Sequence, residues 1–215
     1  MTVRETFLDT SAAVAEWLGA AVVARAWESP SVLEGYTVGG LSGHLLQSIE
    51  RVERFLDGGP GERTRLMPAA EYYALAASFE AGENDSEINV RLREMGEQDG
   101  ASGHRAIVER FARATERLRR RLPGTPADQR VPVMRVADAA ADLDGYLVTR
   151  LVELTVHADD IAASVPCGLP ALPAEAYRLT TELLVQVAVL RVGAPEVVRG
   201  LTRPDRARPD ALRTI

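Results

Sequence analysis

The stretch LDGYLVTRLVELTVHADDIAASV, residues 143–165, decides the fold class of this chain. Its apolar residues recur at spacings of three and four, which is the period of an α-helix with one buried face. That face is formed by Leu143, Leu147, Leu151, Leu154, Ala158, Ile161 and Val165. The spacing therefore predicts a long helix, and we expect Asp138 to be its N-cap.

A second line of side chains runs beside this apolar face, and we call it the polar stripe. Its members are Tyr146, Arg150, Glu153, His157, Asp160 and Ser164. Consecutive members are three or four residues apart, so they project from one side of the helix. A solvent-exposed face is expected to carry dispersed Arg and Glu rather than Tyr, His and single acids next to an apolar face. We therefore expect the polar stripe to border the core and to form the wall of a cleft.

Glu153 and His157 of the polar stripe, together with His44 in LSGHLL, can supply three ligands to one metal ion. Residues at i and i+4 of a helix lie one turn apart on the same face. Three protein ligands of N and O type leave a fourth tetrahedral position free, whereas a structural zinc site usually closes all four. The residues thus indicate an open metal site, with zinc as the first choice and iron, nickel or cobalt compatible with the same ligands. A hydrogen-bonded structural role is the alternative for each histidine.

Two neighbours of these ligands each allow two interpretations. Asp160 either orients His157 as a hydrogen-bond acceptor or faces water. Arg150 either pairs with Glu153 or binds an anionic substrate. Two other residues have simpler expectations. His104, at the start of a later helix, is expected at the surface, and the only cysteine, Cys167, is expected to pack as a small hydrophobe without a disulfide partner.

Helical periodicity also covers most of the remaining chain, which predicts an all-α fold. We expect the first helix to end close to Trp27, and the second to begin after the N-cap Thr37 and to stop at residues 57–60, DGGP. Between residues 58 and 103 the pattern is weaker and fits two short helices separated by the turn-like GEND, residues 82–85.

A third long helix is predicted from Ile107 to the Pro and Gly at 123–124. The following PVMRV is expected to be extended or irregular, with Pro132 unsuited to a central strand. Further helices are expected to begin at Pro173 and Pro195, and the stretch from Thr202 is expected to lie on the surface or to fray.

Length and composition predict one helical bundle, residues 1–167, and a C-terminal helical extension packed on it, residues 168–215. The net charge of −6 argues against nucleic acid as a partner. The uncharged runs are far shorter than the roughly 20 residues of a membrane helix, and no signal pattern begins the chain. We therefore expect a cytoplasmic protein without a membrane partner, and the sequence is compatible with a homodimer.

Three features together carry a family resemblance. They are a first helix ending at Trp27, the stretch YTVGGLSGHLL, and the pattern R-x-x-E-x-x-x-H-x-x-D formed by Arg150, Glu153, His157 and Asp160. Relatives carry W-[ST]-V-x-x-L-x-x-H-L at the second feature, where this chain has Tyr36 in place of Trp. Over about residues 5 to 165, the chain resembles the mycothiol-dependent maleylpyruvate isomerase N-terminal family within the DinB superfamily.

The resemblance implies a DinB-like four-helix bundle of up-down-down-up topology and a divalent metal, usually zinc, on His44, Glu153 and His157. It also implies mycothiol as the thiol cosubstrate, which suits the actinobacterial source indicated by a chain whose 25 basic residues are all Arg. A metal-bound thiol ionises near pH 7 and attacks a small electrophile. In the isomerase the thiolate adds to the cis double bond of maleylpyruvate, permits rotation and leaves to give fumarylpyruvate, while other relatives look like thiol S-transferases.

We expect this chain to be too short to hold the full second domain of the isomerase. Arg150 and Tyr146 are therefore candidates for the anion-binding catalytic residues that such a domain would supply. The expected function is a mycothiol-dependent transferase or isomerase. A non-catalytic metal-binding module for stress or partner binding is the alternative. A TetR-like regulator is more remote, because the basic N-terminal recognition helix is missing.

Overall fold

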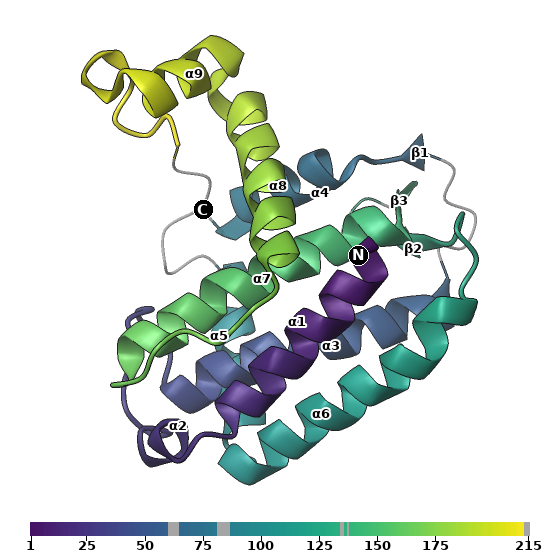
Figure 1. Cartoon of the computed structure of the whole chain (residues 1–215), viewed down its shortest axis with the longest axis vertical. Helices are drawn as coiled ribbons and strands as arrows, with labels where there is room; N and C mark the ends of the chain where they lie inside the picture. The colour runs from purple at the N-terminus through teal and green to yellow at the C-terminus, as the bar shows by residue number, and fades with distance from the viewer. Residues whose placement is uncertain (60–64, 81–86, 134–135, 137, 213–215) are drawn as a thin grey trace.

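A computed structural model describes residues 1–59, 65–80, 87–133, 136 and 138–212, and these residues are mostly helical (Figure 1). The helices are α1 (Val3–Leu18), α2 (Ala21–Arg25), α3 (Val38–Gly58), α4 (Ala69–Glu80), α5 (Glu87–Gly100), α6 (His104–Arg121), α7 (Leu143–Ser164), α8 (Ala174–Val192) and α9 (Ala194–Thr202). The strands are β1 (Arg65–Leu66), β2 (Arg130–Pro132) and β3 (Ala139–Asp142). The mostly helical structure is consistent with the predicted all-α fold, to which it adds one small sheet that the sequence did not predict.

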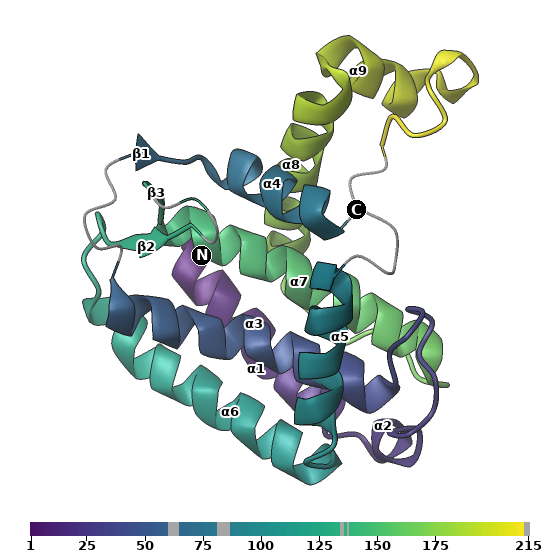
Figure 2. The ribbon, with the colours of Figure 1, turned by 180° about the vertical axis from the view of Figure 1, so that it is seen from behind.

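Four long helices surround the main core. α1 and α3 each contact both α6 and α7, so the four helices lie side by side (Figure 2). The largest side chains enclosed between them are fully buried and include Phe7, Leu45, Ile49, Phe111, Leu118 and Leu147. The last turn of α6 carries basic residues, which complement the helix dipole, and Arg121 pairs with Asp57 of α3 at 2.5 Å. Apolar burial thus fixes α3 and α7, the helices that carry the predicted ligands, next to each other.

The small sheet precedes α7 and changes where that helix begins. β3 is the central strand, with β1 parallel and β2 antiparallel to it. The prediction that Asp138 is the N-cap of this helix was therefore wrong, because residues 139–141 pair as a strand before the helix begins. Asp142 is the N-cap, and its carboxylate accepts a hydrogen bond from the backbone N–H of Gly145 at 2.6 Å. Pro132 ends the edge strand β2, where proline is tolerated, while Met134 and Arg135 of the PVMRV stretch lie outside the described residues.

The first helix ends at Leu18 instead of close to Trp27, and a separate short helix, α2, follows. The carbonyl oxygen of Leu18 would accept from Val22 if the helix continued. His104 Nε2 lies 2.7 Å from that oxygen, and the His104 ring packs edge-on against Trp27 with ring centroids 5.2 Å apart. His104 is thus a partly buried contact between α6 and the end of α1, and the prediction of a surface role was wrong.

Helices α3 and α5 cross with their backbones in direct contact, at what we call the glycine crossing. The backbones of Gly39, Gly40 and Gly43 on α3 lie against those of Gly96 and Gly100 on α5. A Cβ added to Gly43 would lie 2.4 Å from the carbonyl oxygen of Gly96, and one added to Gly100 would lie 2.5 Å from the carbonyl carbon of Gly39. A Cβ on Gly96 would approach the Cβ of His44 to 3.3 Å. The glycines therefore allow α5 to pack against the part of α3 that carries His44.

The region between α3 and α6, where the helical periodicity of the sequence is weak, contains the two short helices that were expected, α4 and α5. The turn predicted at residues 82–85 lies outside the described residues. α4 packs on α7 and α8. Residues 65–66 of β1 connect this region to the small sheet.

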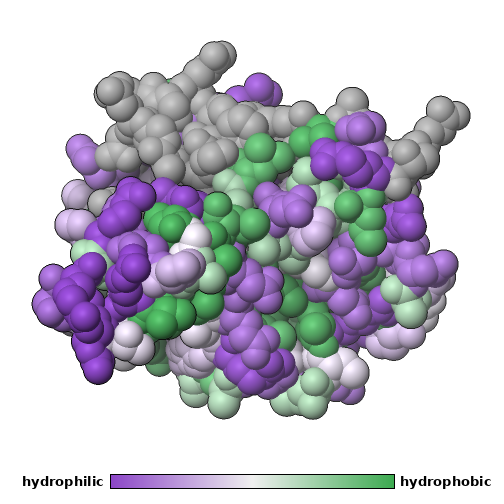
Figure 3. All heavy atoms as spheres, turned by 90° about the horizontal axis from the view of Figure 1, so that it is seen from above, coloured by the Kyte–Doolittle hydropathy of each residue, from purple (hydrophilic) through white to green (hydrophobic). Residues whose placement is uncertain are grey.

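The C-terminal helices extend away from the main core (Figure 1). α8 begins after Pro173 and packs on α4 and α7, while α9 packs on α8. Pro195 lies in the first turn of α9, and the residues from Thr202 to Asp210 are mostly exposed, both as expected. Figure 3 looks onto this end of the molecule, where hydrophobic and hydrophilic side chains alternate. Among the described residues, no helix is long and apolar enough to cross a membrane.

Candidate metal centre

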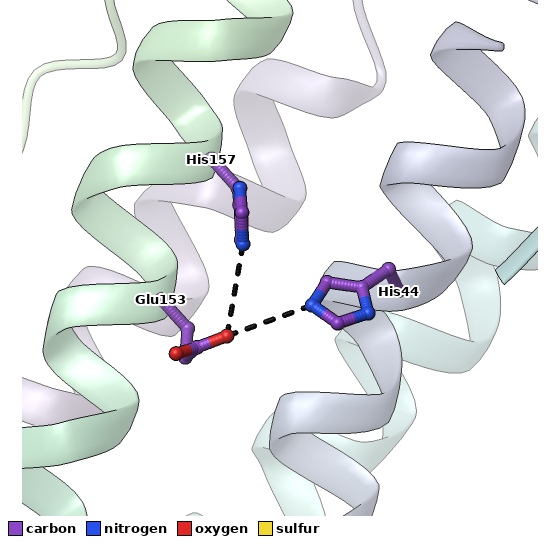
Figure 4. Close-up of side chains that lie close together, drawn as sticks. All are labelled: His44, Glu153 and His157. Atoms are coloured by element: carbon purple, nitrogen blue, oxygen red, sulfur yellow. Dashed lines mark ion pairs between the residues drawn. The ribbon is translucent and has the colours of Figure 1, made fainter. Parts of the chain in front are cut away.

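The three predicted ligand side chains converge between α3 and α7 (Figure 4). His44 comes from α3, while Glu153 and His157 come from successive turns of α7. Oε2 of Glu153 lies 3.6 Å from Nε2 of His44 and 3.7 Å from Nε2 of His157. One ligand atom from each residue lies within 4.8 Å of the other two. Segments about a hundred residues apart in sequence therefore meet at one point.

These separations fit ligands of a shared ion better than hydrogen-bonded partners. A charge-assisted N–H···O bond is about 2.7–2.9 Å long, which is shorter than the 3.6 and 3.7 Å found here. Bonds of about 2.1 Å to a tetrahedral zinc ion place two ligand atoms about 3.4 Å apart. The donor set of two imidazoles and one carboxylate therefore fits a divalent ion such as zinc in chemistry, and the two separations from Glu153 are close to those between ligands of one ion.

Each histidine has a different second contact. Nδ1 of His157 lies 3.0 Å from Oδ2 of Asp160, so this carboxylate contacts the imidazole instead of only facing water. Nδ1 of His44 is buried without a hydrogen-bond partner among the described residues. The His44 ring instead packs edge-on against Tyr36, with ring centroids 5.9 Å apart. The orientation of His157 is set by a hydrogen bond, and that of His44 by packing.

Tyr73 of α4 is a contact of this centre that sequence reasoning missed. Its hydroxyl donates a hydrogen bond of 3.2 Å to Oε1 of Glu153, the oxygen that does not face the histidines. The neighbouring Tyr72 contacts Tyr146 instead, with ring centroids 5.8 Å apart. The only signal in the sequence was the tyrosine pair in a helical segment of weak periodicity, and nothing local connected it with Glu153.

The electrostatics of the cluster favour a charged carboxylate and one charged imidazole. Burial alone would raise the pKa of Glu153, but the contacts with His157 and His44 and the charge of Arg150 hold this pKa well below 4.5. Burial alone would lower the pKa of His157, but Asp160 and Glu153 outweigh it and raise that pKa to about 10. Burial lowers the pKa of His44 from its ordinary value of 6.5, despite Glu153. Near neutral pH and without a metal ion, the His157 imidazole is therefore positively charged and the His44 imidazole is neutral.

The polar stripe is more deeply buried than its sequence indicated. Tyr146, Arg150 and Glu153 are at most 8% exposed, and Tyr146 belongs to the main core, so the prediction that the stripe only borders the core was wrong. The Arg150 guanidinium donates from Nε to Thr149 Oγ1 at 3.2 Å, and its Cζ lies 5.0 Å from the ring centre of Tyr146. Among the described residues no ion pair joins Arg150 to Glu153.

The two remaining positions lie away from the three ligands. Ser164, the last member of the polar stripe, accepts a hydrogen bond from the backbone N–H of Val32 at 2.9 Å and so holds the segment before α3. Cys167 is partly buried against the core, as expected, and burial raises the pKa of its thiol. Neither residue contributes a ligand atom to the cluster.

The chain matches the family model of the mycothiol maleylpyruvate isomerase N-terminal domain over residues 7–162. The matched range contains the three converging side chains. No curated protein and no solved structure matches. Since the matched residues make up well over half of the chain and include the cluster, this protein belongs to the mycothiol maleylpyruvate isomerase N-terminal domain family.

Proposed function

We propose that this protein is a metal-dependent enzyme that uses mycothiol against a small electrophile, as a thiol S-transferase or as a cis/trans isomerase. The observation that carries the proposal is the convergence of His44, Glu153 and His157 in a chain of this family. In the proposal, residues 1–167 form a DinB-like four-helix bundle from α1, α3, α6 and α7. Residues 168–215 form an extension packed on it.

His44, Glu153 and His157 are the proposed ligands of a divalent ion, with zinc as the first choice. When bound, the ion supplies a positive centre that lowers the pKa of a thiol, so that the thiolate nucleophile forms near neutral pH. The Asp160 carboxylate accepts a hydrogen bond from Nδ1–H of His157 and keeps Nε2 directed toward the ligand cluster. His157 acts as a ligand only after losing its Nε2 proton, so metal binding is expected to release a proton.

Arg150 and Tyr146 are the proposed catalytic residues. Arg150 is buried one turn from Glu153 without a carboxylate ion-pair partner among the described residues, so its guanidinium is available for negative charge on the substrate. The Tyr146 hydroxyl is buried and has no hydrogen-bond partner among those residues. Burial raises its pKa to about 12, so the phenol remains protonated and serves as a donor, not as a base.

Metal analysis tests the ligand set. Protein purified without chelator is expected to retain about one divalent ion per chain. His44→Ala and His157→Ala should each abolish retention, and Asp160→Asn should weaken affinity roughly 10- to 100-fold. Less than about 0.2 ion per chain in the unaltered protein, with no binding on titration, would contradict the proposed metal site.

Binding and turnover of mycothiol test the proposed enzymatic activity. With cobalt in place of zinc, adding mycothiol should shift the visible spectrum as a sulfur donor takes the free position. Incubation with a panel of electrophiles that includes maleylpyruvate then separates S-transfer from isomerisation, because only the former consumes thiol. If mycothiol changes neither the cobalt spectrum nor the melting temperature, the protein is instead a non-catalytic metal-binding module.

A further inference from the structure

We infer that Tyr73 of α4 positions Glu153 as a metal ligand, and that the C-terminal helix α8 holds Tyr73 in place. The inference rests on the proposed function, because it concerns how Glu153 meets the ion. α8 lies beyond residues 7–162, the range that matches the family model. A helix outside that range would therefore contribute to the metal centre of this chain.

The two carboxylate oxygens of Glu153 have different neighbours. Oε1 accepts from the Tyr73 hydroxyl at 3.2 Å, while Oε2 is the oxygen nearest to His44 and His157. Glu153 is only 8% exposed, so little water is available to replace the phenol at Oε1. With Oε1 engaged, the carboxylate presents a single oxygen to the ion, and its rotation is restrained.

The ring of Tyr73 is held in a small apolar cluster where α4, α7 and α8 meet. The cluster is separate from the main core and consists of Ala70, Tyr73, Val152, Leu183 and Val187. Leu183 and Val187 come from α8 and are at most 3% exposed. Figure 2 shows α4 lying against α8 above α7, in agreement with the contacts between these helices. α8 is thus the element that presses α4 and its tyrosine toward Glu153.

A tyrosine with a purely structural role, whose buried hydroxyl only needs an acceptor, would form the same hydrogen bond as a tyrosine that positions Glu153. The two roles differ in what removal of the hydroxyl changes. A purely structural tyrosine contributes to the stability of the fold, whereas a positioning residue changes the affinity and the ligand field of the metal. Tyr73→Phe separates them because phenylalanine keeps the ring in the apolar cluster and removes only the donor.

The first experiment compares Tyr73→Phe with Tyr177→Phe in the full chain. Tyr177 lies on α8 and is 42% exposed, so its substitution is a matched control away from the ligands. Zinc affinity is measured by chelator competition, and the cobalt derivative by its visible spectrum. Tyr73→Phe should weaken zinc binding about 10-fold or more and shift the cobalt bands. Tyr177→Phe should change neither.

The second experiment tests α8. Val187→Ala and Leu183→Ala loosen the apolar cluster, and Leu190→Ala, on the same helix but 54% exposed, is the control. Made singly, Val187→Ala and Leu183→Ala should each weaken zinc binding. Combined with Tyr73→Phe, each should change zinc affinity by less than about two-fold, because the hydrogen bond that these residues support is already absent. Val187→Ala removes less volume and serves if Leu183→Ala does not fold.

The outcomes distinguish this inference from the proposed function. Zinc bound equally well by Tyr73→Phe and the unaltered protein overturns the inference and leaves the metal site intact. Unchanged zinc affinity in Val187→Ala or in a folded Leu183→Ala overturns the part assigned to α8. Absence of zinc binding by the unaltered protein overturns the proposed function, and the inference with it.

Discussion

The glycine crossing makes a sharp prediction about Gly43→Ala. In an open helix this substitution stabilises by about 0.5–1 kcal/mol, because alanine loses less backbone entropy on folding. Here the new Cβ would lie 2.4 Å from the carbonyl oxygen of Gly96, and real Cβ atoms essentially never approach closer than 3.0 Å. α5 must therefore retreat by at least about 0.6 Å along a contact made by backbone on both sides, and no side chain can rotate away.

Overpacking of this kind typically costs about 1–3 kcal/mol. After subtraction of the gain in helix propensity, Gly43→Ala should lose up to about 2.5 kcal/mol of unfolding free energy, or up to about 10 °C in melting temperature. Gly58→Ala is the matched control, since it lies on the same helix and its added Cβ meets no atom within 4 Å. Urea and thermal unfolding of both variants, at the same metal loading, measure the difference. Equal stability of Gly43→Ala and Gly58→Ala would refute the direct backbone contact between α3 and α5.

Three further predictions concern single groups. Because the pKa of His157 is about 10 in the folded, metal-free protein and 6.5 ordinarily, its contribution to stability is complete below about pH 6.5 and is lost as the pH rises toward 10. Urea midpoints of chelator-treated protein should therefore fall between pH 7 and about 10, and a rising trend would contradict the raised pKa. His104→Ala removes the donor to the Leu18 carbonyl and should cost about 1–2 kcal/mol in urea unfolding without changing zinc affinity. Burial raises the pKa of Cys167, so iodoacetamide at pH 7 should label it more slowly than free cysteine, and equal rates would argue against that burial.

The parts of the fold that could be predicted are those with a strong local period. α3, α6 and α7 extend over three turns or more with one apolar face, and the N-cap at Thr37 was identified because its side chain is a typical cap. β3 was missed because residues 139–141 are alanines, which favour helix, and became a strand only by pairing with β1 and β2. The end of α1 was misplaced for a similar reason, since His104 arrives from a distant part of the chain.

The candidate site follows the same division. The i,i+4 spacing on one helix identified Glu153 and His157 as neighbours, and the pattern around His44 supplied the third member. Their burial, the hydrogen bond from Tyr73 and the lack of an ion pair between Arg150 and Glu153 had no counterpart in any local pattern.

The sequence by itself therefore determined the long helices, the types of the candidate ligands and the helix faces on which they lie, because these depend on residues within a turn or two of each other. Only the tertiary structure decided how close α5 lies to His44, which oxygen of Glu153 is left for a metal, and which helix presses Tyr73 into place. These depend on contacts between segments whose relative positions are set by the packing of the whole chain, and no short window of sequence contains both partners.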